Sequence, residues 1–189
     1  MILRGIVKLA CGDAKGLSEF ASTPEAFTAS LAPLIAFPMV GAVAMGLSGS
    51  WKLAVLGFLC RLCTVLVLPV LTYEFSRFFG RQDQWLRTAT ALNWCFWLVL
   101  PSVLVAAMLG SLMVQFGLPM QSAELAVFVV VGFYLLWNRW FILKAGLAIR
   151  GWRAILILLA SLVLTAAFSL LLIGVVGLPP IGTATGSLI

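Results

Sequence analysis

Residues 154–176 read AILILLASLVLTAAFSLLLIGVV and contain no charged side chain. About 20 apolar residues in a helix cross the roughly 30 Å hydrocarbon core of a bilayer. No water reaches the backbone there, so the peptide groups of a lipid-exposed segment must bond within one helix. This stretch therefore predicts a membrane-spanning helix and indicates an integral membrane protein.

Four further apolar stretches of spanning length precede it, and we expect their helices at about 27–47, 53–79, 89–114 and 123–143. The composition agrees, because 63% of the 189 residues are hydrophobic and 10% are charged, whereas a soluble domain carries about 25% charged residues. The predicted fold class is all-α, a polytopic membrane bundle with five transmembrane helices. We expect a cytoplasmic amphipathic segment at 1–26, the five-helix transmembrane domain at 27–178 and a flexible non-cytoplasmic tail at 179–189.

Basic residues alternate between the ends and loops of the chain when Arg77 and Arg139, near the ends of their stretches, are counted with the loop that follows. Three precede the first stretch, three lie in the second loop and four in the fourth, against one in the first loop. Short loops rich in lysine and arginine stay in the cytoplasm. We therefore expect the inner (plasma) membrane, a cytoplasmic N-terminus and a periplasmic or extracellular C-terminus. The cations expected to contact lipid headgroups, anionic ones included, are Arg4, Lys8, Lys15, Arg77, Arg81, Arg87, Arg139, Lys144, Arg150 and Arg153.

The first 20 residues predict a short interfacial helix rather than a sixth span. Their three cations share one face at helical spacing, and Leu9 and other apolar residues lie opposite. Such a helix lies in the membrane interface with its apolar side down. Asp13 interrupts this pattern, so we expect a helix to about Ala10, a turn and a second short piece. A mobile cytoplasmic tail is the alternative.

Local signals also mark the start and the shape of the first span. Thr23 precedes Pro24 and Glu25, an order typical of a helix N-terminus in which the threonine caps free backbone N–H groups. Pro33 and Pro38 lie inside the span and are expected to kink it.

Few polar side chains lie inside the spans. Arg61 and Glu74 lie in the second stretch and Asn93 in the third. A charge inside a membrane is costly, which makes such residues functional candidates by default. Arg61 can instead extend its guanidinium towards the headgroups, and Glu74 can lie at the interface. Asn93, Asn138 and pairs of small residues favour hydrogen bonds and close packing between helices.

Cys60 and Cys63 form a CxxC pair on one helical face of the second stretch. Membrane thiol oxidoreductases use such pairs, but they relay electrons to a second cysteine pair, and within the spans only Cys95 remains. We favour the interpretation that these cysteines pack as small hydrophobic residues. The chain has no histidine, phosphate-binding glycine loop or nucleophile elbow. We expect no catalytic site, no metal and no cofactor.

Three stretches resemble the Yip-domain membrane family, in its bacterial branch. They are residues 30–38 (SLAPLIAFP), 91–94 (ALNW) and 137–142 (WNRWFI), the last continuing to 153–154. The likeness covers most of the chain, although the Asp-Leu-Tyr-Gly-Pro signature of eukaryotic members is not present. The resemblance implies a non-enzymatic membrane protein that acts through protein or lipid contacts and has no catalytic residues.

These patterns together predict a non-enzymatic scaffold or accessory subunit. Its expected partners are membrane lipids and other membrane proteins or a second copy of the chain, with no nucleic acid. One alternative is a transporter or channel component, in which Arg61 and Glu74 would matter. A second alternative is a membrane thiol redox protein that uses Cys60 and Cys63.

Overall fold

The structure is a computed structural model and describes residues 2–47, 49 and 51–176. Every regular element in this part is helical: α1 (Ile2–Ala10), η1 (Ala14–Glu19), α2 (Pro24–Leu47), α3 (Trp51–Phe78), η2 (Gln82–Gln84), α4 (Trp85–Cys95), η3 (Phe96–Leu98), α5 (Val99–Gln115), α6 (Met120–Gly146) and α7 (Gly151–Val176). Within the described residues, five helical stretches are long and apolar enough to cross a membrane, and η2, α4, η3 and α5 together form one of them, Gln82–Gln115. The predicted all-α fold with five spans is confirmed. The predicted tail at 179–189 lies outside the described residues.

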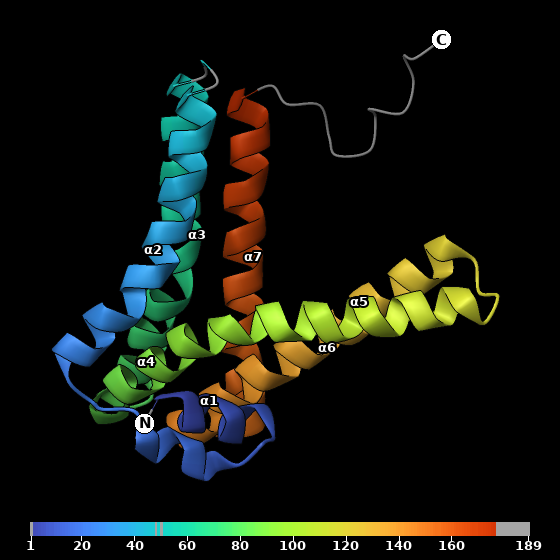
Figure 1. Cartoon of the computed structure of the whole chain (residues 1–189). Coiled ribbons are helices and arrows are strands. Elements are labelled where there is room, and N and C mark those ends of the chain that lie inside the picture. Colours follow the sequence, from blue (N-terminus) through green and yellow to red (C-terminus); the bar gives the residue numbers. More distant parts are fainter. Residues whose placement is uncertain (1, 48, 50, 177–189) are drawn as a thin grey trace.

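The long helices form two groups that leave a common base (Figure 1). In the first group α3 packs against both α2 and α7. In the second group α5 and α6 pair as a hairpin that points in a different direction. We call the base the end of the molecule where α1, α4, the end of α6 and the start of α7 meet. The two loops predicted to be cytoplasmic, at 79–84 and 147–150, both lie there.

The hydrophobic core sits at this base, where side chains from α1, α4, α6 and α7 meet. The apolar side chains that are completely covered there include Leu9, Ile142, Leu143, Leu147 and Ile157. Away from the base, apolar side chains point outwards, and Leu104 of α5 is 68% exposed. Lipid tails are as apolar as leucine, so a bilayer accommodates such a surface.

The N-terminal segment follows the predicted order of a short helix to Ala10, a turn and a second short piece. The structure adds that α1 docks on the bundle. Ile6 and Leu9 are buried in the core, whereas Leu3 is 79% and Val7 61% exposed. Protein therefore covers part of the face that we assigned to the membrane interface, and the outer part of that face remains free for lipid.

The start of α2 has the predicted cap. The backbone N–H of Ala26 donates to Oγ1 of Thr23 at 3.3 Å, and the helix begins at Pro24. α2 continues as a helix through Pro33 and Pro38, and Figure 1 shows that its first part leans away from the direction of the rest. This bend fits the loss of two backbone donors at the prolines.

The third span is helical over the expected 89–114, but it is not one regular α-helix. α4 ends at Cys95, and a 3-10 turn separates it from α5. Pro101 explains the break, because it has no N–H to donate to the carbonyl of Trp97 and its ring crowds that carbonyl. The chain relieves this conflict by tightening the turn just before the proline.

Candidate functional site

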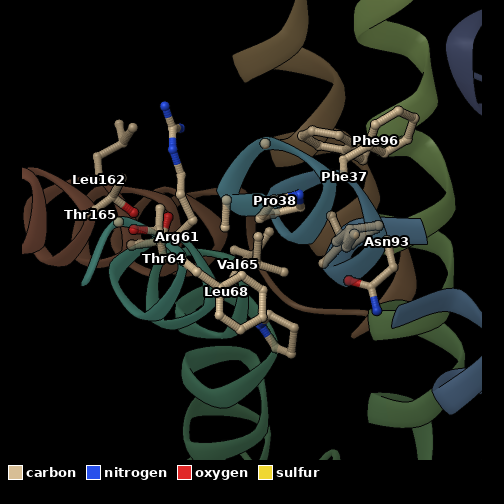
Figure 2. A pocket seen from close by; sticks show the side chains of 18 of the residues that line it. Phe37, Pro38, Arg61, Thr64, Val65, Leu68, Asn93, Phe96, Leu162 and Thr165 are labelled. Atoms are coloured by element: carbon tan, nitrogen blue, oxygen red, sulfur yellow. The ribbon is translucent and has the colours of Figure 1, made fainter. Parts of the chain in front are cut away.

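A cavity of about 700 Å³ lies between α2 and α7, with α3 as its back wall (Figure 2). It exists because α2 and α7 each pack along α3, and in the described part of the chain neither packs extensively against the other. Its wall is mainly apolar and includes Phe37, Phe58 and Leu68. The volume is in the range of small-molecule sites, which are about 300–1,000 Å³.

The cavity is long and open to one side. Along α3 it extends from Ala54 to Pro69, which corresponds to about 22 Å at the rise of an α-helix. At the base, Asn93 of α4 and Arg139 of α6 contribute to its end wall. The lining residues that remain exposed are Phe37, Gly41, Met45, Arg61, Phe96 and Leu162. In a membrane this open side faces lipid.

Both charged residues of the cavity wall are arginines. Arg61 is exposed, and Figure 2 shows its side chain extending from α3 past Thr165 and Leu162 of α7. Arg139 is half-buried, and the described residues supply it with no hydrogen bond or ion pair. No acidic side chain of the described chain lines the cavity. The site therefore favours an anion.

Two of the predicted intramembrane amides link helices, as expected. Nδ2 of Asn93 donates to Oγ of Ser30 at 2.9 Å, and this buried bond holds α4 against α2. Nδ2 of Asn138 donates to the backbone carbonyl of Leu9 at 3.0 Å and holds α6 against α1. The serines of α7 instead donate to carbonyls of their own helix.

Most of the predicted headgroup cations lie exposed at or near the base. They are Arg4, Lys15, Arg77, Arg81, Arg87, Lys144 and Arg150. Two of the ten also contact aromatic rings: Lys144 lies 5.1 Å from the ring centre of Trp140, and half-buried Arg153 lies 4.8 Å from that of Phe79. Arg139 differs from the others because it forms part of the cavity wall.

Lys8 has a partner within the N-terminal segment. Its Nζ lies 2.8 Å from Oε1 of Glu19, so the ion pair joins α1 to η1. The pKa of Glu19 is about 2, below its usual value of 4.5, and the hydrogen bond from Lys8 is the largest cause of this shift. Lys8 is therefore partly engaged by protein and less available to a lipid headgroup than Arg4 or Lys15.

The remaining candidates are the cysteines within the spans and Glu74. Cys60 is half-buried and Cys63 exposed on α3, Cys95 is buried on α4, and all are free thiols. Glu74 is exposed on α3, four residues before that helix ends. In the described part of the chain, no three histidine, cysteine or acidic side chains gather as metal ligands would.

The cavity was not predicted from the sequence, and neither was the place of Arg139 in it. The available signals were weak: Gly41 and Gly57 leave open space on α2 and α3, where an added Cβ would meet no atom within 4 Å. Comparison with protein-family models, curated proteins and solved structures finds no match for this chain.

Proposed function

We propose that this chain is a non-enzymatic integral membrane protein that acts as a scaffold or accessory subunit through protein and lipid contacts. The observation that supports it most is the α5–α6 hairpin. The two helices approach closely at Gly110, where an added Cβ would lie 3.0 Å from Val127. The contact between α5 and α6 uses one face of each helix. Large apolar side chains on the other faces stay exposed, and Phe128 of α6 is 77% exposed. A projecting apolar hairpin is suited to pack against another membrane protein.

The cations at the base support the lipid part of the proposal. A lysine or arginine near an anionic leaflet contributes about 1 kcal/mol to membrane attraction. By the positive-inside rule, the base faces the cytoplasm across the inner (plasma) membrane, with the C-terminus on the opposite side. The resemblance to the bacterial Yip-domain proteins is a further argument for contacts rather than catalysis.

Photo-crosslinking from the hairpin tests the scaffold role. A photoreactive amino acid replaces Phe128 of α6, and a matched variant carries it at Val163 of α7, which is 66% exposed. In native membranes we expect position 128 to give a protein adduct of defined mass and position 163 to give lipid adducts. Lipid adducts alone from position 128 would contradict the proposal.

One observation favours a transporter or channel component as the second candidate. Irregular backbone within spans often lines substrate sites in transporters, and the 3-10 turn at Phe96–Leu98 contributes Phe96 to the cavity wall. Arg61 would then contact the solute. If the purified chain moves an anion in liposomes and Arg61→Ala abolishes the flux without changing expression, this candidate replaces the first.

A further inference from the structure

We propose that the cavity between α2, α3 and α7 binds one anionic lipid, with its phosphate at Arg139 and an acyl chain along α3 towards Ala54. The inference deepens the lipid contact of the proposed function and rests on that function for the placement of the chain in a bilayer. The scaffold role and the lipid site can be disproved independently, because the crosslinking experiment on the hairpin does not involve the cavity.

The charge of the site selects an anion. Arg139 is half-buried, and it has no hydrogen-bond or ion-pair partner among the described residues. A guanidinium that is partly withdrawn from water without a protein partner costs free energy, and a bound anion recovers part of it. Its planar fork of donors matches the oxygens of a phosphate. No acidic lining residue of the described chain competes for it.

The depth of Arg139 selects a lipid over a free ion. The base end of the cavity, which Arg139 helps to close, is at Pro69 of α3, nine positions before that helix ends at Phe78, and this corresponds to about 14 Å along the α3 axis. The headgroup layer on each side of the hydrocarbon core is roughly 5–7 Å thick, and an arginine side chain can reach outwards. A lipid of the base-side leaflet already holds its phosphate near this level, whereas a free ion would have to leave water.

The shape of the cavity suits an acyl chain. Beyond Arg139 the wall is mainly apolar, and the cavity extends from Pro69 to Ala54, about 22 Å along α3. Gly41 and Gly57 face open space within it, so a chain can lie against the backbone of both helices. The exposed rim lets a lipid enter sideways from the bilayer without crossing the protein.

A binding titration tests the headgroup. The delipidated full-length protein in detergent is titrated with dioctanoyl phosphatidylglycerol, dioctanoyl phosphatidylcholine and inorganic phosphate, and native mass spectrometry counts the bound molecules. We expect one phosphatidylglycerol per chain, weaker binding of phosphatidylcholine and no binding of phosphate alone. Arg139→Gln should weaken phosphatidylglycerol binding roughly tenfold or more, because it removes a charged hydrogen bond. Arg77→Gln, which changes an exposed arginine outside the cavity, should leave it unchanged.

A second pair of variants tests the acyl chain. Gly57→Leu fills the path of the chain and should weaken both lipids, and Gly41→Leu should do the same. Gly132→Leu is the matched control, since an added Cβ there also meets nothing within 4 Å but the residue lies outside the cavity wall. Melting temperature and size-exclusion profile report on folding. Arg139→Gln should not lower the melting temperature of the lipid-free protein, because no protein partner is lost.

Four results would overturn the proposal. They are equal affinity for the two lipids, binding of inorganic phosphate as tight as that of phosphatidylglycerol, undiminished binding to folded Arg139→Gln, and equal binding to Gly57→Leu and Gly132→Leu. If Arg61→Gln lost lipid binding while Arg139→Gln kept it, the phosphate would lie at Arg61, and the proposed position of the lipid would be wrong. Loss of the hairpin adduct at position 128 with intact lipid binding would defeat only the scaffold role.

Discussion

Asn138 of α6 donates a hydrogen bond to the backbone carbonyl of Leu9 at 3.0 Å, at the point where α1 ends. One turn earlier on the same face, Oη of Tyr134 donates to the carbonyl of Ala10 at 3.1 Å. The last carbonyls of a helix lack partners within the helix, so two side chains of α6 cap the C-terminus of α1. The amphipathic N-terminal helix is thereby fixed to the bundle.

Removing this cap should release α1. Asn138→Leu deletes one donor, and the Leu9 carbonyl still accepts from the backbone N–H of Gly12 at 3.1 Å, so the loss should be about 0.5–1.5 kcal/mol of unfolding free energy. Trypsin should then cleave faster after Lys15, because η1 has to unfold locally to enter the protease. Tyr134→Phe removes a less buried bond and should have a smaller effect. Equal cleavage rates in wild type and Asn138→Leu would show that the cap does not hold the segment.

The bond between Ser30 and Asn93 should stabilise the contact between α2 and α4. Because both side chains are buried, a double-mutant cycle with Ser30→Ala and Asn93→Leu should give a coupling energy of about 0.6 kcal/mol and at most about 1.7 kcal/mol, the range for membrane helices. Reversible unfolding in mixed detergent micelles measures it. A coupling energy of zero would mean that the two helices are held by apolar packing alone.

Gly146 should be intolerant of larger side chains. An added Cβ would lie 2.7 Å from Cγ2 of Thr88, where α4 crosses the end of α6. Gly146→Val should therefore lower the unfolding free energy by about 1–3 kcal/mol through overpacking. Gly132→Val provides the comparison on the same helix, since nothing lies within 4 Å of its added Cβ. Similar stability losses in the two variants would attribute the effect to helix propensity instead.

Acid should loosen the N-terminal segment. The pKa of Glu19 is about 2 in the folded protein against its ordinary 4.5, so the unfolded segment takes up the proton first. The Lys8–Glu19 pair therefore stabilises the fold above about pH 4.5 and is lost as the pH falls towards 2. A spin label on exposed Cys11, in a background without the other cysteines, should gain mobility across this range. Glu19→Gln should show a pH-independent signal; an equally flat wild type would refute the role of the pair.

Thiol labelling of intact cells tests the orientation. Gln82 and Gln121 are exposed at opposite ends of the predicted spans. In a cysteine-free background, a membrane-impermeant reagent should label Gln121→Cys from outside and Gln82→Cys only after the membrane is opened. The expected result follows from the concentration of cations beside Gln82. The reverse pattern would place the base outside the cytoplasm.

The sequence by itself determined the five spans, the cap at Thr23 and the end of the first helix at Ala10. These features are local, since each crossing of a bilayer needs an apolar helical stretch of spanning length and caps act within a few residues. The 3-10 turn before Pro101 also has a local cause, because this proline has no backbone N–H to donate.

Tertiary structure alone decided what the polar residues do. Arg139 and Arg77 look alike in sequence, as arginines near the base ends of their helices, yet the first lines a cavity and the second is exposed. That difference arises because α2 and α7 both pack on α3 and leave a gap that α4 and α6 close at one end. Helices in lipid have no general hydrophobic drive to associate, so which faces meet depends on close packing and hydrogen bonds between distant residues. Neither hydropathy nor charge alternation reports on those contacts.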